Sequence, residues 1–376
     1  MTRVLVAPDK FKGSLSGAEV AAALARGLTA AAPGVEVRSL PVADGGDGTL
    51  AAAEAAGFER VPVTATGPTG QPVGTAFGRH GDRAVVEMAD VSGLSRLPDG
   101  RPAPLAATSR GTGEVIAAAL ADGARRIVLG IGGSACTDGG AGMLQALGAR
   151  LLDEDGRELG PGGAALGRLA RVELDRLHPA LSGAEIVVAC DVDNPLTGPL
   201  GAAAVYGPQK GATPEDVALL DAHLVRFADL LAEATGRDVR DERGAGAAGG
   251  VGYAALAVLG ATLRPGIDLL LDLLDFSSHV HDADLVVVGE GSLDEQSLRG
   301  KAPVGVARLA RAAGARVVAV CGQTTLGTEQ LRAAGIDAVY ALAHLEPDPQ
   351  RSMAEAAPLL ERVAGLLAER ELSRRA

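Results

Sequence analysis

The stretch Asp284-Leu-Val-Val-Val-Gly-Glu-Gly-Ser-Leu-Asp-Glu-Gln-Ser-Leu-Arg-Gly-Lys301 decides how the rest of the chain is organised. Its apolar residues Leu285 to Val288 predict a buried strand. After Lys301 the pattern predicts an amphipathic helix, with Pro303 near the first turn, where proline is tolerated. A strand that leads carboxylates and an ammonium to a helix start suits phosphates and a divalent cation. The polar loop expected between strand and helix contains Glu290, Asp294 and Glu295.

Five segments of the chain repeat this strand-then-helix pattern, with strands near residues 3, 36, 284, 316 and 338. They predict a doubly wound, flavodoxin/Rossmann-like parallel-sheet domain built from both chain ends, residues 1–61 and 284–376. In flavodoxin-like order the first strand neighbours the third, and ligands bind at the crevice where the order reverses. The loop with Asp9 should then lie beside the loop with Glu290. A last helix is expected over about 352–371.

The pattern changes from Arg60, where three short strands over 61–65, 73–79 and 83–89 predict an antiparallel meander. We therefore expect residues 62–283 to form an inserted, mixed-sheet α/β domain. The expected fold is α/β with two domains, and the active site is expected in the cleft between them.

The composition excludes several classes of function. A net charge of -12 argues against nucleic acid or anionic membranes as partners. No apolar run is long enough for a transmembrane helix, and the N-terminus enters a strand at Arg3 without a signal peptide, so a cytoplasmic protein is expected. Three widely spaced cysteines predict free thiols. Small-molecule partners are expected, for a monomer or homodimer.

Lysine is scarce in this chain, because only four of the 35 basic residues are lysines. Each lies in or beside a glycine-containing loop, and arginine serves almost everywhere else. These lysines are therefore candidates for sites that need a compact ammonium, although a few could survive by chance. The four are Lys10, Lys12, Lys210 and Lys301.

Other glycine-rich and acidic loops leave alternatives open. Asp44 and Asp47 lie in a loop that fits either a turn or a metal site. Gly130 to Ala135 resembles a dinucleotide fingerprint, yet close approach to phosphate or tight helix packing explains its glycines as well. The segment Asp191-Val-Asp-Asn194 follows a predicted strand and fits a binding loop or an Asx turn. A Walker A motif is absent, because Glu295 stands where it needs glycine.

Taken together, the loops resemble those of the bacterial glycerate kinase family, the glycerate 2-kinases of the glyoxylate and glucarate pathways. The resemblance covers the whole chain, with the loops in the same order. It implies ATP-dependent phosphorylation of D-glycerate, Mg²⁺ dependence, 2-phosphoglycerate as the favoured product over 3-phosphoglycerate, and two α/β domains with the second inserted in the first. The matching motifs are Ala7-Pro-Asp-Lys-Phe-Lys-Gly-Ser-Leu-Ser16, Ala43-Asp-Gly-Gly-Asp-Gly-Thr49, Gly130-Ile-Gly-Gly-Ser-Ala135, Asp191-Val-Asp-Asn-Pro-Leu196, Gly207-Pro-Gln-Lys-Gly-Ala212 and Gly289-Glu-Gly-Ser-Leu-Asp-Glu-Gln-Ser297.

Site roles follow from chemistry, because phosphoryl transfer needs held phosphates, cations and a group that orients the hydroxyl. Gly132, Gly133 and Ser134 are expected to offer backbone donors at a helix N-terminus. The candidates for catalysis are Asp9, Lys12, Asp191 and Lys301. Those for binding substrate or phosphate are Lys10, Ser14, Gly132, Gly133, Ser134, Asn194 and Lys210. Those for Mg²⁺ are Asp294, Glu290 and Asp191.

Two other functions compete with a small-molecule kinase. One is a Rossmann-type, NAD-dependent oxidoreductase that uses the loop from Gly130 to Ala135. The other is a non-catalytic protein that binds anions. Release of ADP from MgATP in the presence of D-glycerate separates the kinase from both.

Overall fold

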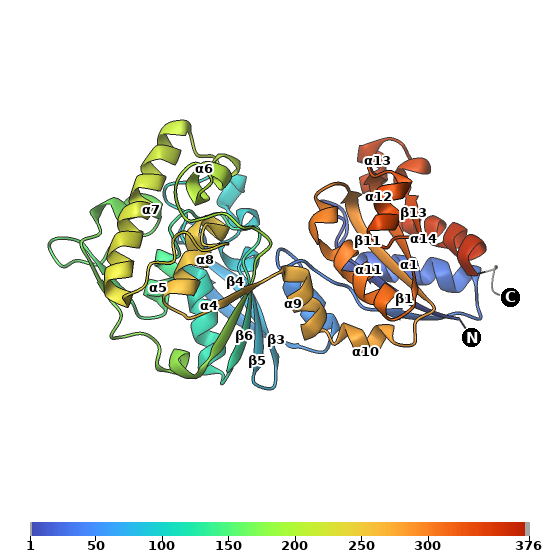
Figure 1. Cartoon of the computed structure of the whole chain (residues 1–376), viewed down its shortest axis with the longest axis horizontal. Helices are drawn as coiled ribbons and strands as arrows, with labels where there is room; N and C mark the ends of the chain where they lie inside the picture. The colour runs from blue at the N-terminus through green and yellow to red at the C-terminus, as the bar shows by residue number, and fades with distance from the viewer. Residues whose placement is uncertain (1, 373–376) are drawn as a thin grey trace. The chain divides into compact units, whose positions relative to one another are not determined.

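The structure is a computed structural model, and it describes residues 2–372 (Figure 1). The chain divides into two compact units, and each is described by itself. Unit 1 comprises residues 1–44, 51–57 and 265–376, and unit 2 comprises 45–50 and 58–264. The insertion was expected to run to residue 283, so the segment 265–283 belongs to the other unit from the one expected.

Unit 1 contains a five-stranded parallel sheet in the order β13-β12-β11-β1-β2. Numbered within the unit, this is the flavodoxin-like order 2-1-3-4-5, and it confirms that the first strand pairs with the third. The strands are β1 (Arg3–Pro8), β2 (Glu36–Ser39), β11 (Leu285–Leu293), β12 (Arg316–Thr324) and β13 (Ala338–Ala341).

Strands β11 and β12 are longer than the sequence predicts. The apolar run in β11 is buried from Leu285 through Gly289, as a central parallel strand requires. Pairing then continues to Leu293 opposite Thr324. The polar loop was predicted to begin directly after Val288, so that boundary was wrong, and Glu290 projects from the sheet itself. Strand β12 likewise extends to Thr324.

Helices cover both faces of this sheet. One apolar core lies between the sheet and α1 with α14, and another lies against α9 to α12. The single helix predicted over 352–371 is broken at Glu355 into α13 and α14, followed by one π-helical turn. The helices are α1 (Gly17–Ala31), α9 (Gly266–Leu273), α10 (Phe276–Val280), α11 (Ala302–Ala312), α12 (Thr328–Ala333), α13 (Pro349–Ala354) and α14 (Ala356–Leu367), with α2 (Thr49–Ala55) shared between the units.

The starts of α1 and α11 are fixed by different devices. Ser16 caps α1 in a capping box with Glu19. Helix α11 begins after Lys301, which has an extended backbone and makes no side-chain cap. Its proline lies at the first turn as predicted.

Unit 2 contains a six-stranded mixed sheet in the order β10-β9-β6-β5-β4-β3. The meander of β3, β4 and β5 is antiparallel as predicted, and the remaining pairs are parallel. The strands are β3 (Glu59–Thr66), β4 (Pro72–His80), β5 (Arg83–Glu87), β6 (Arg126–Gly130), β9 (Glu185–Ala189) and β10 (Thr262–Arg264), with a separate pair β7 (Arg150–Leu152) and β8 (Arg171–Glu173).

One large apolar cluster forms the core of unit 2, built mainly from Ala, Val and Leu because the chain has few aromatic residues. Helix α7 is the longest helix of unit 2; Thr213 caps its start, and Gly236 ends it with a left-handed backbone. The helices are α3 (Ala89–Ser92), α4 (Arg110–Ala121), α5 (Ala141–Ala146), α6 (Ala202–Tyr206), α7 (Pro214–Thr235) and α8 (Ala247–Ala257).

The start of α8 is locked against the loop before α5. Ala248, Gly249 and Gly250 all have positive φ. A Cβ on Gly249 would lie 2.1 Å from the carbonyl oxygen of Cys136, so only glycine allows this approach. Ala248 at φ 53° pays a steric penalty that glycine would not.

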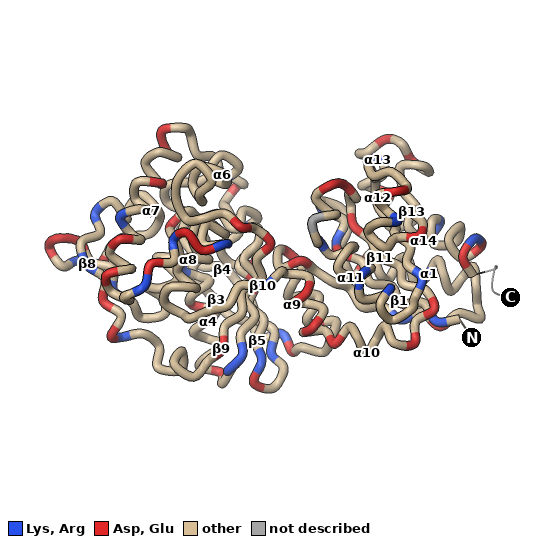
Figure 2. The backbone as a smooth tube through the Cα atoms, in the orientation of Figure 1, with Lys and Arg blue, Asp and Glu red and all other residues tan. Residues whose placement is uncertain are grey.

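Charged residues of both signs are interspersed along the chain in both units (Figure 2). None of the described helices is long and apolar enough to span a lipid bilayer. The three cysteines are free thiols, as predicted. The fold class expected from the sequence, a parallel-sheet unit built from both chain ends and a mixed-sheet insertion, is confirmed.

Candidate functional site

Strands β1 and β11 of unit 1, at whose ends a binding crevice was predicted, are neighbours in the sheet (Figure 1). The Asp9 N–H donates to the Gly289 carbonyl at 2.8 Å, immediately beyond the paired strands. A Cβ on Gly291 would lie 3.3 Å from the backbone nitrogen of Lys12, so the two segments are in close contact. The prediction that the Asp9 and Glu290 segments lie side by side is confirmed.

Asp9 occupies the floor of this edge and is only 7% exposed. Its Oδ1 accepts from the Lys10 N–H at 2.6 Å and lies 3.7 Å from the Lys10 ammonium. Burial raises the pKa of Asp9 to about 6; Lys10 lowers it and the charge of Asp44 raises it further. Asp9 therefore changes protonation close to neutral pH.

Glu290 is the second perturbed carboxylate of this edge. Burial raises the pKa of Glu290 to about 7, Ser297 and Lys301 lower it, and the charges of Asp9 and Asp294 raise it. Its Oε1 is buried and has no hydrogen-bond partner within the described chain. A carboxylate oxygen left without a donor is suited to receive a cation.

Asp294 and Lys301 lie after β11, where they were predicted. The Asp294 carboxylate accepts from the Gln296 N–H at 2.8 Å, so it also shapes its own turn. Lys301 is half-buried, and its ammonium donates to the Gln296 side chain at 3.4 Å. That long contact is weak, so the ammonium is readily available to a ligand.

Lys12 and Ser14 follow Asp9 in the same segment, but their side chains have different surroundings. Lys12 is exposed. The Ser14 hydroxyl instead donates to the Met353 carbonyl at 2.7 Å, which ties the segment to α13. This contact gives Ser14 a structural role, and its binding role stays a prediction.

The glycine-rich loop of unit 2 packs backbone to backbone against residues 45–47. The Gly132 N–H donates to the Gly45 carbonyl at 3.2 Å, and a Cβ on Gly132 would lie 2.6 Å from Gly46 Cα. Helix α5 begins only at Ala141, so Gly132 to Ser134 are not at a helix N-terminus, and that prediction was wrong. Within this group Gly133 is exposed, with φ 74°.

Lys210, a predicted ligand for substrate or phosphate, is buried. Its side chain is 2% exposed, and the ammonium donates to the Ser134 hydroxyl at 3.0 Å and the Cys136 carbonyl at 2.5 Å. Burial lowers the pKa of Lys210, opposed by the charges of Cys136 and Asp138. No ligand can touch this ammonium while it is held in this way.

The segment after β9 contains exposed aspartates and an asparagine whose side chain forms hydrogen bonds within the protein. Asp191 and Asp193 are exposed, and Asp193 forms a bidentate pair with Arg243 at 2.5 and 3.0 Å. The Asn194 carbonyl accepts from the Tyr206 hydroxyl at 2.5 Å, and its amide donates to Leu200 at 2.8 Å. Asn194 thus links this segment to α6, and its role in binding substrate stays a prediction.

Two buried carboxylates of unit 2 were not predicted as site residues. Glu87, at the end of β5, accepts from the N–H groups of Gly48 at 3.1 Å and Leu50 at 2.8 Å. Burial raises the pKa of Glu87 to about 6. The available signal was an acidic residue ending an apolar strand. Asp138 is fully buried and accepts from Thr108, Ser109, Gly140 and Gly142.

The three candidate magnesium ligands are divided between the two units. Over residues 2–372, no group of three or more His, Cys, Asp or Glu residues could hold a metal ion. Glu290 and Asp294 lie in unit 1, whereas Asp191 lies in unit 2. Magnesium is commonly bound through one or two carboxylates together with substrate phosphates, and Glu290 fits that pattern.

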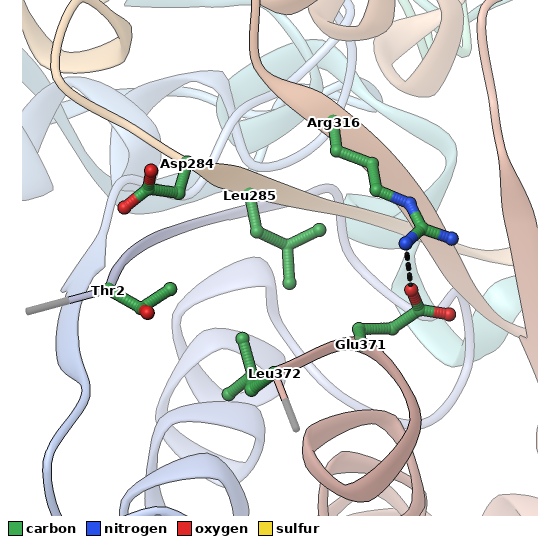
Figure 3. Close-up of a pocket in the computed structure, with 6 residues that line it drawn as sticks. All are labelled: Thr2, Asp284, Leu285, Arg316, Glu371 and Leu372. Atoms are coloured by element: carbon green, nitrogen blue, oxygen red, sulfur yellow. Dashed lines mark ion pairs between the residues drawn. The ribbon is translucent and has the colours of Figure 1, made fainter. Parts of the chain in front are cut away.

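A small pocket lies at the opposite edge of the unit 1 sheet (Figure 3). Arg316 pairs there with Glu371 at 2.7 Å, and Glu371 also accepts from the Tyr340 hydroxyl at 2.7 Å. These contacts fasten the last turn of the described chain to the sheet. Ligands of open α/β sheets bind at the carboxyl ends of the strands, which leaves this pocket structural. It is lined by Thr2, Asp284, Leu285, Arg316, Glu371 and Leu372.

Comparison with known proteins gives the family. A family model described as "Glycerate kinase family" matches residues 4–370. The chain belongs to the glycerate kinase family. It is therefore an enzyme, a kinase. It is 47% identical to a glycerate kinase of Bacillus subtilis (strain 168) over 365 residues, which is 96% of each chain.

Further relatives cover nearly the whole chain. A glycerate 2-kinase of Escherichia coli (strain K12) is 46% identical over 90% of each chain. The crystal structure of a putative glycerate kinase 2 from Salmonella typhimurium LT2 matches with a TM-score of 0.85 and 43% identity, covering 100% of both chains. Membership of the glycerate kinase family gives no support to the NAD-dependent alternative.

Proposed function

We propose that this chain transfers the γ-phosphoryl group of ATP to D-glycerate, with Mg²⁺ bound, and that 2-phosphoglycerate is the product. Family membership supports glycerate as the acceptor, because the Bacillus and Escherichia relatives are named for it. The observation that carries the chemistry is the group of lysines and perturbed carboxylates at the carboxyl edge of the unit 1 sheet.

Lys12 and Lys301 are proposed to neutralise the phosphate oxygens. Lys12 is exposed, and Lys301 stands directly before α11, where backbone N–H groups also favour an anion. Both ammonium groups follow strands that are neighbours in the sheet. Phosphoryl transfer relies on positioning and charge stabilisation, so these two cations would contribute mainly to the rate.

Asp9 is proposed to accept the hydroxyl proton of glycerate. With its pKa raised to about 6, it is ionised at neutral pH and remains basic enough to accept a proton. The neighbouring Lys10 holds the carboxylate in place from 3.7 Å. Asp191 was the other candidate base, but it is exposed, whereas Asp9 is buried.

Glu290, supported by Asp294, is proposed to hold Mg²⁺ directly or through water. The unpartnered Oε1 of Glu290 and the charge of Asp294 beside it form an acidic pair that suits a hard cation. When bound, the ion neutralises charge that develops on the transferred phosphoryl group. In the absence of the cation, Glu290 is expected to hold a proton part of the time near pH 7.

Purified protein incubated with ATP, Mg²⁺ and D-glycerate tests the proposal. We expect release of ADP that depends on all three, and ³¹P NMR should place the new phosphate on the C2 oxygen. A resonance of a phosphate on the C3 oxygen would overturn the assignment of 2-phosphoglycerate as product and leave the rest of the proposal standing. If protein that binds ATP releases no ADP in the presence of D-glycerate, then D-glycerate is not the acceptor.

A further inference from the structure

Lys210 is the single lysine of unit 2, and its side chain is buried. The proposed function gives it no role. Its two acceptors, the Ser134 hydroxyl and the Cys136 carbonyl, are both neutral. Within the described residues, no carboxylate lies within ion-pair distance of its Nζ. A charge buried against neutral oxygens alone is unfavourable, so its retention needs an explanation.

Asp138 is the carboxylate that acts most strongly on Lys210, but its oxygens serve other groups. They accept from the Thr108 and Ser109 side chains and from backbone N–H groups at Ser109, Gly140 and Gly142. Lys210 instead faces Ser134 and Cys136. The positive charge of Lys210 therefore lies against Ser134 of the glycine-rich loop.

The outer side of that loop is open at Gly133. Gly133 is exposed, whereas Ser134 beside it is 6% exposed and accepts from the ammonium. The loop is also rigid, because its backbone is held by Gly45 on one side and by Ser92 on the other. A charge fixed behind a rigid loop acts on whatever binds in front of it, and low dielectric extends its reach.

We propose that Lys210 is a positioning residue whose buried ammonium draws the anionic group of a substrate, a phosphate or a carboxylate, to the outer face of the loop at Gly133. This rests on the proposed function, because ATP and D-glycerate supply the two candidate anions. The ammonium acts through the loop and does not touch the ligand. It thus replaces the direct contact that the sequence predicted for this lysine.

Two variants separate the charge from its hydrogen bonds. Lys210→Gln keeps a donor for Ser134 or Cys136 and removes the charge, whereas Lys210→Met removes both. Calorimetry with ATP, adenosine and D-glycerate then measures binding, and thermal melting shows which variants are folded. Arg157→Gln, at an exposed position of the same unit, is the control for loss of a positive charge.

We expect Lys210→Gln to weaken either ATP or D-glycerate by about tenfold or more, while adenosine binding changes less than twofold. Loss for ATP assigns the phosphates to this loop, and loss for D-glycerate assigns the carboxylate. Wild-type affinity for both anions in folded Lys210→Gln overturns the proposal, whatever Lys210→Met does. Equal weakening of ATP and adenosine also overturns it. Turnover of D-glycerate by the wild-type protein is measured separately. Its absence would show that the proposed function is wrong, whereas unchanged binding in Lys210→Gln would show that the role of Lys210 is wrong.

Discussion

Polar residues of the loops differ between the two units in how far their side chains are used inside the protein. In unit 1, Lys12 and Glu290 lie at the carboxyl edge of the sheet with groups left open to a ligand. In unit 2, Lys210 and Asn194 occupy similar loops after strands or before helices, yet their polar atoms are satisfied inside the protein. A lysine in a glycine-rich loop is therefore informative about function only when its burial is known.

This contrast has a physical origin in the two sheets. The strand order of unit 1 reverses beside β1, so the connections after neighbouring strands run to opposite faces of the sheet. Ligands of such sheets bind between these connections. In unit 2, residues 45–47 pack closely against residues 130–133, and residues 249–250 pack closely against residues 136–139. Close backbone packing leaves little room for side chains to reach out, and the polar groups there support the loops.

Removing an ammonium from unit 1 is the strongest way to test this comparison. We expect Lys12→Met and Lys301→Met to lower kcat/KM for glycerate by about 10² to 10³, because each removes a cation from the proposed phosphate site. Steady-state kinetics measures the loss, and unchanged melting temperatures exclude unfolding. Lys12→Arg and Lys301→Arg should also lose most activity, because the guanidinium is larger and planar.

The matched control in unit 1 is Arg26→Gln, an exposed residue paired with Glu361. We expect its activity to stay within twofold of wild type. If Lys12→Arg and Lys301→Arg both turn over like wild type, the inference from lysine scarcity is wrong.

The backbone lock of unit 2 should respond to a single methyl group. Gly249→Ala places a Cβ 2.1 Å from the Cys136 carbonyl at φ 70°, so we expect unfolding to become easier by about 3 kcal/mol. The matched substitution Ala248→Gly relieves a positive φ and should be neutral or stabilise by up to about 1 kcal/mol. Denaturant titration measures both. Equal stability of the two variants would contradict the lock.

The raised pKa of Glu290 predicts that the free energy of unfolding of the unliganded protein falls as the pH rises. A carboxyl whose folded pKa is about 7, against an ordinary 4.5, contributes stability below pH 4.5 that is lost as the pH rises through 7. Glu290→Gln lacks this loss, so it should be more stable than wild type by on the order of 2 kcal/mol above pH 7. The difference should shrink towards pH 4.5. Denaturation without Mg²⁺ or ATP over pH 4.5–8 measures it.

The same variant should lose kinase activity although it is more stable. A Glu290→Gln variant with wild-type turnover would remove this residue from the proposed cation site. Stability that fails to change with pH relative to wild type would show that the carboxyl is not perturbed.

The smallest effect is expected from the internal hydrogen bond of Asn194. Tyr206→Phe removes the 2.5 Å contact to its carbonyl and should cost about 1 kcal/mol of unfolding free energy. We expect KM for both substrates to stay within about threefold, because Asn194 is held away from ligands by a second bond to Leu200. A large rise in KM for glycerate would restore Asn194 as a binding residue.

The sequence by itself determined the order and type of most elements in this protein. Apolar runs such as that from Leu285 to Val288, and capping signals such as Thr213, are local, and local patterns set local structure. The rhythm of strands and helices also predicted the unit 1 strand order, which fixed the site edge that holds Asp9 and Glu290. The family followed from motifs alone.

Tertiary structure decided which of the candidate side chains are open to a ligand. Lys210 and Lys12 have similar sequence surroundings, but packing encloses the first and leaves the second exposed. The extension of β11 past Val288 likewise depends on its pairing with β12, a contact between segments about 30 residues apart. Burial, register and pKa depend on what distant segments bring to a residue, and no local pattern records that.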